Sequence, residues 1–350
     1  MKISIGANVV EGPWGGGNLF FKNFIKYFSN LGNTVVNDLL DDDIDIILLT
    51  DPRSDSVSSS FTHKEIKKYL KYINNNAVVV QRINECDERK STIGLNKFYM
   101  EANKIADHTV FVSSWIFNIY KNLGISEETS SVFLGGGDSK IFNSENRKKW
   151  DGKEKIKLVT HHWSSNKNKG IDVYKKLDEL LEKKHLSKLL DFTYVGNLSK
   201  DIKLKNANLI QPMYGESLSD ELKKYHIYIT ASMNEPSGNH HIEAAQTGLP
   251  ILYIDSGGIP EYCNGYGIIY NFENLEEKIL ELIENYNFYF EKLLNYPFNN
   301  ESLFSQYENL FEKLNQDKEI ILRKRNIKPN KNLIKKEYFR LILKIKKLFN

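Results

Sequence analysis

Two glutamates and two adjacent histidines fall within nine residues of the segment NEPSGNHHIEAAQTGLP, which spans residues 234–250. Carboxylates and imidazoles bind divalent metal ions, and carboxylates also accept hydrogen bonds from the hydroxyl groups of sugars. His240 and Glu243 are three residues apart, so on a helix they would share one face. The segment is therefore a metal site, a binding site of another kind, or the polar start of a helix that binds no ligand.

The spacing of these residues argues against a metal site. Glu235, His161 and His162 would be needed to complete a set of ligands around His240. The sequence contains no HExxH motif, and adjacent side chains on a helix point about 100° apart. His240 and His241 therefore cannot readily bind one ion, and we expect no bound metal.

The start of a helix at Pro236 and Ser237 favours an anionic ligand instead. Backbone N–H groups in the first turn of a helix have no intrahelical partner, and together with the helix dipole they attract phosphate. Gly238 removes a side chain where a ligand has to approach the backbone closely. Glu235 in the loop and Glu243 inside the helix would then accept hydrogen bonds from sugar hydroxyls.

This segment and the residues after it, TGLPILYIDSGGIPEY, resemble the signature of the retaining nucleotide-sugar glycosyltransferases of family 4, a part of the group 1 glycosyltransferases with the GT-B fold. That signature has two glutamates with a glycine between them, then alanine, a Gly-x-Pro step into a strand, and Gly-Gly-x-x-Glu. Nine residues of this chain fall at those places within 27 residues: Glu235, Gly238, Glu243, Ala244, Gly248, Pro250, Gly257, Gly258 and Glu261.

The resemblance implies a role for each residue of a donor site. Glu235 would act in catalysis and face the donor sugar, while Glu243 would bind the hydroxyl groups of the ribose. The co-substrate would be a nucleoside diphosphate sugar, with no other cofactor and no metal. Four further residues would bind the donor: Gly238, Asn239, His240 and Gly258.

The chain departs from the family at the residues that neutralise the leaving diphosphate. The family has Gly-Arg, followed about five residues later by Lys-Gly, whereas this chain reads THHWSSNKNKG. Lys169 and Gly170 match, but the arginine position falls near Trp163 or Ser164. An arginine binds two phosphate oxygens at once, and a lysine does not. We expect Lys169 to act in catalysis and Lys167 to supply the missing charge, with the nearby histidines and serines as alternative donors of hydrogen bonds.

A glycine-rich stretch, GPWGGGNLF, follows the first predicted strand. The family carries a glycine-rich loop there, near the donor phosphates and the acceptor, so the resemblance implies that role for Gly15, Gly16 and Gly17. A flexible turn is the alternative. The stretch is not a dinucleotide fingerprint, because GxGxxG starting at Gly15 would need glycine at Phe20. A Rossmann dehydrogenase is therefore disfavoured.

Polar residues also follow the apolar run AVVV, in the stretch QRINECDERKS. The family often has an acceptor-side histidine or polar residue at this strand end, and no histidine occurs here. Arg82, Asn84 and Asp87 are the candidates, with an ordinary surface ion pair between Arg82 and Asp87 as the alternative.

The elements that position these residues repeat one pattern twice. Short apolar runs such as KISI, DIDIILL and HTVFVS alternate with helical patterns such as HKEIKKYLKYI, and the alternation restarts after a charged stretch at residues 144–155. Strands alternating with helices predict parallel sheets that are covered on both faces. Ligands in such sheets bind beyond the carboxyl ends of the strands.

We therefore predict an α/β protein of the GT-B fold, with two Rossmann-like domains that face a central cleft and a helical C-terminal extension. Residues 1–145 would be the acceptor domain. Residues 146–317 would be the nucleotide-sugar donor domain, whose last helix crosses back to the first. The bulk composition, 41% hydrophobic and 27% charged, fits a globular protein, and two distant cysteines with no secretory signal favour the cytoplasm.

The last residues form a basic tail. Residues 318–350 contain twelve Lys and Arg against two Glu, a net charge of +10, so the body carries −7 of the total of +3. An acidic body argues against a nucleic-acid partner. Within residues 331–350, a predicted helix lies either on an anionic membrane surface or against the first domain or a partner. Five apolar residues recur on one face of that helix: Ile334, Tyr338, Leu341, Ile345 and Leu348.

The sequence thus predicts a retaining, metal-independent, hexosyltransferase-type enzyme. It would move a sugar from a nucleoside diphosphate sugar to a carbohydrate or lipid-linked acceptor, in polysaccharide or glycolipid assembly, and it would be cytoplasmic and peripheral at the inner face of the membrane. A GT-B nucleotide-sugar epimerase is one alternative. A non-catalytic protein that binds nucleotide sugars is another, favoured by the altered arginine position.

Overall fold

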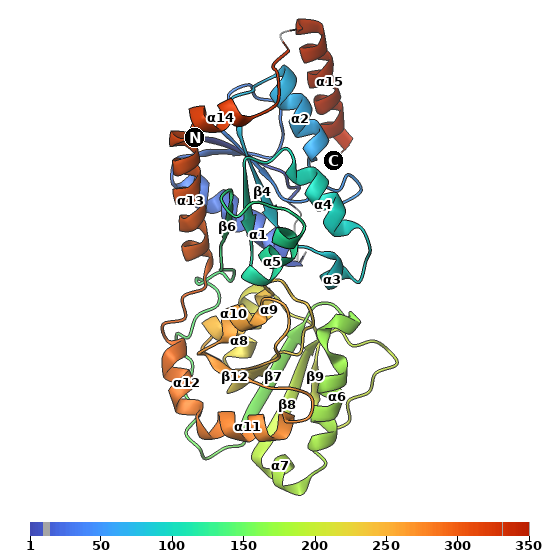
Figure 1. The fold of residues 1–350 in the computed structure, drawn as a ribbon. Coiled ribbons are helices and arrows are strands. Elements are labelled where there is room, and N and C mark those ends of the chain that lie inside the picture. Colours follow the sequence, from blue (N-terminus) through green and yellow to red (C-terminus); the bar gives the residue numbers. More distant parts are fainter. Residues whose placement is uncertain (10–14, 331, 350) are drawn as a thin grey trace. The chain divides into compact units, whose positions relative to one another are not determined.

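The computed structural model describes residues 1–9, 15–330 and 332–349. The chain forms two compact units. Unit 1 comprises Met1–Phe133 and Leu303–Asn350, and unit 2 comprises Leu134–Ser302. Each unit contains a six-stranded sheet of parallel strands with helices packed on it (Figure 1), which confirms the predicted pair of α/β sheets. The units divide near residues 133 and 302, whereas the sequence placed the domain boundaries at 145 and 317.

Unit 1 is built on a sheet whose strand order reverses once. Its strands are β1 (Lys2–Ile5), β2 (Thr34–Val36), β3 (Ile46–Leu49), β4 (Val78–Ile83), β5 (His108–Phe111) and β6 (Ser130–Val132). They lie in the order β2-β1-β3-β4-β5-β6, so the winding changes direction between β1 and β3. β3 and β4 are buried along their whole length, which is why they are rich in Val, Ile and Leu.

The helices of unit 1 come from both parts of its sequence. They are α1 (Gly15–Asn30), α2 (His63–Tyr72), α3 (Asp87–Lys90), α4 (Leu95–Asn103), α5 (Ser114–Asn122), α13 (Asn300–Gln316), α14 (Lys318–Lys324) and α15 (Leu333–Phe349). α1 and α13 meet through aromatic rings, with centroid distances of 5.8 Å between Phe24 and Phe304 and 5.5 Å between Phe28 and Phe311. From Leu303 onward, α13 is therefore part of the hydrophobic core of unit 1.

The basic residues from Lys318 onward also belong to unit 1. Arg325 pairs with the carboxylate of Asp107, and it donates to the carbonyl oxygens of Asn75 at 2.7 Å and Ala77 at 2.8 Å. The side chains of Arg325 and Asp107 are both largely buried, so they anchor the segment between α14 and α15. α15 then packs beside α2 (Figure 1). None of the helices in the described ranges is long and apolar enough to cross a bilayer.

Unit 2 is a second parallel sheet with one reversal. Its strands are β7 (Ile156–His162), β8 (Leu190–Gly196), β9 (Asn208–Ile210), β10 (Ile227–Ile229), β11 (Ile251–Tyr253) and β12 (Gly267–Ile269). They lie in the order β12-β11-β10-β7-β8-β9, which places the reversal between β7 and β10. This is the strand order of a Rossmann fold. The edge strand β12 was not predicted from the sequence.

Helices pack on both faces of this sheet. The helical segments of unit 2 are η1 (Lys167–Lys169), α6 (Ile171–Leu180), α7 (Lys184–Leu189), α8 (Gly215–Leu222), α9 (Asn239–Gln246), α10 (Ile259–Cys263), α11 (Leu275–Glu284) and α12 (Tyr286–Leu293). Alternate residues of β7 point to opposite faces. Leu158 joins the core that includes α6 and α11, and Val159 joins the core that includes α8, α9 and α10.

Candidate functional site

The polar side chains singled out in unit 2 gather where the winding of its sheet reverses. β7 ends at His162, β10 ends at Ile229, and these strands are neighbours. The loop after β7 leads into η1, and the loop after β10 leads into α9. Ligands of open α/β sheets bind at such a reversal, beyond the carboxyl ends of the strands. The fold therefore brings the predicted donor residues to the expected edge of this sheet.

Lys169 and Glu235 form an ion pair at this edge. The Nζ atom of Lys169 lies 2.7 Å from Oε2 of Glu235, and both side chains are mostly buried. The N–H of Met233 donates to the carbonyl oxygen of Asn168, which holds η1 beside the loop after β10. Gly170 has a φ of +74°, and a Cβ atom there would lie 2.0 Å from a carbonyl oxygen just after β10. The Lys-Gly step of the sequence therefore lets the ammonium group reach Glu235.

Three glycines fix the backbone around Glu235. The N–H of Gly258 donates to the carbonyl oxygen of Glu235 at 2.9 Å. Gly257 leaves room for this contact, because a Cβ atom there would lie 2.3 Å from the same oxygen. Gly238 has a φ of +79°, and its Cβ would lie 2.8 Å from both Cγ of Glu235 and Cε1 of His241. The sequence explained Gly238 by a close approach of ligand, but the side chains of the protein itself already require glycine here.

The helix of the motif begins later than the sequence predicted. Pro236 and Ser237 were expected to open it, but α9 starts at Asn239 with Gly238 as its N-cap. The positive φ of Gly238 lies outside the right-handed helical region, so the residues before it remain in the loop. Asn239 and His240 therefore carry the first backbone N–H groups of the helix, and an anion is favoured there.

The imidazole of His240 contacts the end of β10. Its Nε2 atom lies 2.9 Å from Oγ1 of Thr230 and 3.3 Å from Oγ of Ser232. Its ring centroid is 6.3 Å from that of His161 and 4.9 Å from that of His241, so the ring is a neighbour of both histidines. His240 has internal partners for its side chain, which leaves its backbone N–H as the group that a ligand would use.

Glu243, on the helix that follows β10, is paired with a histidine of the neighbouring strand β7. Nε2 of His161, near the end of β7, lies 3.1 Å from Oε2 of Glu243, and both residues are buried. A carboxylate accepts hydrogen bonds, so Nε2 of His161 carries the proton that it donates. Its Nδ1 atom is buried without a hydrogen-bond partner in the described part of the chain. The sequence had offered His161 only as a metal ligand or a donor to phosphate.

Burial keeps the neighbouring histidines uncharged at neutral pH. Desolvation lowers the pKa of His162 and His240 well below the ordinary 6.5, and it lowers the pKa of His241 to about 3. The positive charge of Lys169 acts in the same direction on all three rings. His162 has a neutral partner, since Nε2 lies 2.7 Å from the hydroxyl of Tyr174. These histidines therefore add no positive charge to the site.

The rings of the other three histidines all lie within 6.3 Å of the ring of His240, but Nε2 of His161 faces Glu243 and Nε2 of His162 faces Tyr174. His240 faces β10, whereas His241 lies against the ring of Tyr262, with 5.6 Å between centroids. Among residues 1–9, 15–330 and 332–349, no three His, Cys, Asp or Glu side chains are arranged to hold a metal ion.

The missing arginine has no substitute from elsewhere in unit 2. Arg147 is the only arginine in residues 134–302. Its guanidinium is buried and donates to backbone carbonyl oxygens, including that of Tyr225 at 3.0 Å. Trp163 and Ser164, near the expected arginine position, are exposed, and so is Lys167. Lys167 therefore remains the nearby cation on the same segment as Lys169.

The glycine-rich stretch of unit 1 is helical where the structure describes it. Residues 10–14 lie outside the described residues. Gly15, Gly16 and Gly17 form the first turn of α1, and this corrects the loop predicted for them. Because first-turn N–H groups lack intrahelical partners, this turn still offers backbone donors.

The three acceptor-side candidates of unit 1 lie at or after the end of β4. The guanidinium of Arg82 is buried and stacks on Phe20, 4.1 Å from the ring centroid. Asp87 accepts from the backbone N–H of Leu95 at 2.9 Å and organises the turn before α4. Asn84 is half-buried. Arg82 and Asp87 thus have partners of their own, which argues against the surface ion pair considered as the alternative.

Sequence reasoning missed a charged pair at the reversal of the sheet in unit 1. Arg53 binds the carboxylate of Asp51 with two parallel hydrogen bonds of 2.8 and 2.7 Å, just after β3. The stretch TDPR after the apolar run IILL was the available signal. Asp51 and Arg53 occupy in unit 1 the position that the donor candidates occupy in unit 2.

Comparison with known proteins assigns a family to unit 2. Residues 142–296 match the family model described as glycosyl transferases group 1. Most of unit 2 is therefore similar to a group 1 glycosyltransferase domain. This match covers Lys169, Glu235 and Glu243, the residues that the sequence motif identified. No curated protein matches the chain significantly.

Solved structures resemble most of the chain, including both units. HepE from Anabaena, in complex with UDP, has a TM-score of 0.66 at 12% identity over 89% of this chain and 100% of its own. Sucrose-phosphate synthase from Thermosynechococcus elongatus has 0.60 at 13% identity, over 89% and 98%. TarM from S. aureus has 0.58 at 17%, over 82% and 57%, so this chain spans little more than half of TarM. These likenesses confirm the GT-B fold.

Proposed function

We propose that the protein is a retaining glycosyltransferase that moves a sugar from a nucleoside diphosphate sugar to a hydroxyl group of an acceptor. The observation that carries this proposal is the pairing of Lys169 with Glu235 and of His161 with Glu243, at the start of α9 in a group 1 glycosyltransferase domain. HepE, which resembles this chain, was solved with UDP and glucose. Uridine diphosphate sugars are therefore the first donors to test.

In this proposal Lys169 exchanges partners when the donor binds. Without donor its ammonium group is neutralised by Glu235. A diphosphate at the start of α9 attracts that group away, because it carries more negative charge than one carboxylate and also accepts from the backbone N–H groups of Asn239 and His240. The carboxylate of Glu235 then accepts hydrogen bonds from the sugar hydroxyls. Lys167 adds a second positive charge in place of the family's arginine.

Glu243 binds the two ribose hydroxyls in this arrangement. A buried carboxylate needs hydrogen-bond donors, and His161 supplies one at 3.1 Å. The histidine holds the carboxylate in one orientation and leaves its other lone pairs for the ribose. His161 is thus a positioning residue, and Glu243 is the group that touches the donor.

The proposed step breaks the bond between the anomeric carbon and the diphosphate and forms a bond to the acceptor oxygen on the same face. A phosphate oxygen of the leaving diphosphate takes the proton of the acceptor hydroxyl, as the family resemblance implies. Lys169 and the helix N–H groups stabilise the negative charge that develops on the diphosphate, and preorganised donors of this kind need no metal.

The acceptor is proposed to bind unit 1 through the polar residues at or after the ends of β3 and β4. Their carboxylate, amide and guanidinium groups suit a carbohydrate or a lipid-linked glycan. We propose polysaccharide or glycolipid assembly at the cytoplasmic face of a membrane as the setting. The residues concerned are Asp51, Arg53, Arg82 and Asn84.

A thermal-shift screen with UDP-, GDP- and ADP-sugars tests the donor proposal. One nucleotide should raise the melting temperature of the wild type, and Lys169→Ala should abolish that rise. Lys175→Ala is the matched control, because Lys175 is a half-buried lysine of the same domain that pairs only loosely, at 3.9 Å, with Asp172 of its own helix. The donor proposal fails if no nucleotide sugar raises the melting temperature, or if both variants respond alike.

Product analysis separates the remaining alternatives. With donor and acceptor, NMR of the product should show the anomeric configuration of the donor. Conversion of a nucleotide sugar in the absence of acceptor would instead identify an epimerase. Tight binding without turnover would identify a non-catalytic binding protein, which is the alternative that the missing arginine favours.

A further inference from the structure

Helix α15 has two apolar faces, and the protein covers one of them. Phe339 and Leu343 are 3% and 6% exposed, and they join a core cluster with Ile66 and Leu70 of α2. The inner face of α15, meaning the face that carries these two residues, is therefore part of the packing of unit 1.

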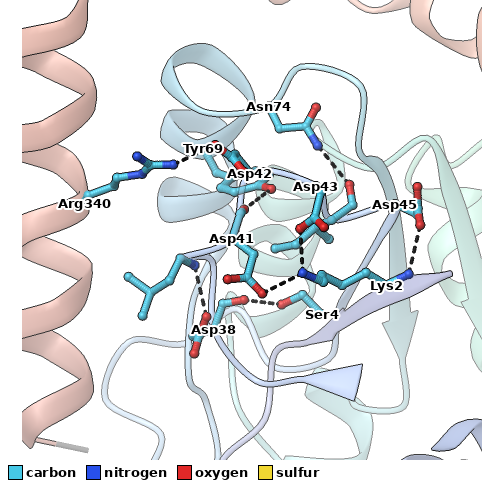
Figure 2. Close-up of polar contacts among 12 residues, drawn as sticks. Lys2, Ser4, Asp38, Asp41, Asp42, Asp43, Asp45, Tyr69, Asn74 and Arg340 are labelled. Atoms are coloured by element: carbon cyan, nitrogen blue, oxygen red, sulfur yellow. Dashed lines mark hydrogen bonds and ion pairs between the residues drawn. The ribbon is translucent and has the colours of Figure 1, made fainter. Parts of the chain in front are cut away.

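Ion pairs around the inner face neutralise most of the charge of α15. The helix has six Lys and Arg against one Glu. Arg340 lies 3.0 Å from Asp42, in the aspartate-rich loop between β2 and β3 (Figure 2), and Lys336 lies 3.8 Å from the same carboxylate. Lys347 pairs with Asp38 of this loop at 2.5 Å, and Lys346 pairs with Glu65 of α2 at 2.9 Å. The acidic loop thus supplies most of the ion pairs that hold α15 on unit 1, while the apolar contacts come from α2.

The opposite side of α15, here called the outer face, is apolar and exposed. It consists of the five residues whose spacing defined the predicted amphipathic helix, so that prediction identified the face that does not pack. Their exposed fractions are 82% for Ile334, 66% for Tyr338, 54% for Leu341, 46% for Ile345 and 83% for Leu348. Exposed apolar surface of this extent marks an interaction site.

We propose that the outer face of α15 binds the surface of an anionic lipid bilayer while the inner face stays docked on unit 1. The stripe from Ile334 to Leu348 runs along one side of a straight helix for roughly 21 Å, which suits burial in a flat interface. Exposed Lys335 and Lys344 flank it on either side and can reach lipid headgroups. Pairing of two copies through this stripe would bring these lysines together, so charge favours a bilayer over a second copy.

The docking of the inner face gives this proposal a mechanical consequence. A free amphipathic tail would only tether the protein. A helix that is docked on unit 1 through the packing of Phe339 and the ion pair of Arg340 with Asp42 instead holds unit 1 itself at the membrane surface. An acceptor carried by a lipid would then be presented to unit 1. That last statement rests on the proposed function, but binding of the bilayer does not.

The test is sedimentation of the full chain with vesicles of phosphatidylcholine and phosphatidylglycerol in a 7:3 ratio. The wild type should pellet with them, and the double variant Leu341→Glu/Ile345→Glu should lose at least about tenfold in bound fraction. Asn315→Glu/Gln316→Glu adds the same charge at exposed positions of α13 and should bind like the wild type.

Two outcomes would overturn the proposal: no pelleting of the wild type, or equal pelleting of the outer-face variant. Light scattering without lipid distinguishes the second-copy alternative, because a dimer that Leu341→Glu/Ile345→Glu dissociates would assign the stripe to self-association. The donor-induced rise in melting temperature should persist in this variant. If that rise persists while vesicle binding is lost, the variant has lost membrane binding and its donor site is intact.

Discussion

Units 1 and 2 use the same parallel-sheet scaffold, but polar pairs distinguish the strand ends of unit 2 and an aromatic layer distinguishes the core of unit 1. In unit 2 the reversal between β7 and β10 is lined by buried histidines, a Lys–Glu pair and a His–Glu pair. In unit 1 the helix that follows β1 carries Phe20, Phe24 and Phe28, which pack on the aromatic rings of α13. A polar, desolvated sheet edge is costly to build and suits a charged ligand, while the aromatic layer between α1 and α13 stabilises the fold.

The largest expected effect lies in unit 1, which should depend on α13 for its stability. Phe311 is fully buried against Phe24 and Phe28. Phe311→Ala removes these contacts and should cost about 3–5 kcal/mol in the free energy of unfolding. Hydrogen exchange followed by mass spectrometry should show the loss in peptides of unit 1. Equal loss of protection in β7 to β12 would mean that the two units do not unfold separately.

Lys169→Ala should have the next largest effect, on the chemistry of unit 2. Removing one preorganised donor to a developing negative charge costs about 10²–10³ in rate. Steady-state kinetics with the donor identified in the thermal-shift screen would measure this loss, and Lys175→Ala serves again as the control. Turnover of Lys169→Ala near the wild-type value would remove Lys169 from the catalytic site.

Glu243→Ala should also impair transfer, through weaker binding of the donor, and His161 provides a graded test of that role. His161→Leu leaves Glu243 without this hydrogen bond, which is worth about 1.5–3 kcal/mol for a charged acceptor. We expect KM for the donor to rise by at least tenfold and kcat to change less. His161→Gln keeps an N–H donor and should recover part of the loss. If the role of His161 were merely structural, both variants would instead have a lower melting temperature, and KM would not change more than kcat.

Acid should destabilise unit 2 more than unit 1. Buried His162, His226, His240 and His241 have pKa values below 6.5, and those of His226 and His241 are lowered to about 4 and about 3. The unfolded chain then takes up protons first as the pH falls. Stability is therefore complete above pH 6.5 and is lost progressively below it.

Each such histidine contributes about 1 kcal/mol of this loss between pH 7 and 5.5. Unit 1 has His108, whose pKa burial lowers to about 4, and His63, whose pKa is lowered. Hydrogen exchange at the two pH values, corrected for intrinsic rates, should therefore show a larger loss of protection in unit 2. An equal loss in both units would contradict the comparison.

The sequence predicted the periodic elements well and the long-range pairings poorly. α15 covers Leu333–Phe349, the segment in which apolar spacing predicted a helix, because spacing is a local property. The choice of its docked face was not predictable, since both Phe339 and Leu341 are apolar and only the fold decides which one meets α2. β12 was missed because three residues at a sheet edge leave little pattern.

At the candidate site the same limit applies. Glu235, Glu243 and Lys169 were identified from local motifs, and their roles in catalysis and binding remain predictions. The contact of His161 with Glu243 joins residues 82 positions apart and depends on the pairing of β7 with β10. The start of α9 was misplaced because proline commonly opens a helix, whereas here the backbone of Gly238 sets the boundary.

The division of the chain has a consequence for synthesis on the ribosome. Unit 2 is one continuous stretch, whereas unit 1 needs Leu303–Asn350 to complete a core begun by Met1–Phe133. A nascent chain therefore emerges with the aromatic surface of α1 uncovered. The ribosome must synthesise all of unit 2 before α13 emerges and can cover that surface. Chaperones that bind exposed aromatic surface should consequently favour the amino-terminal half during translation, even though unit 2 is made later and can fold earlier.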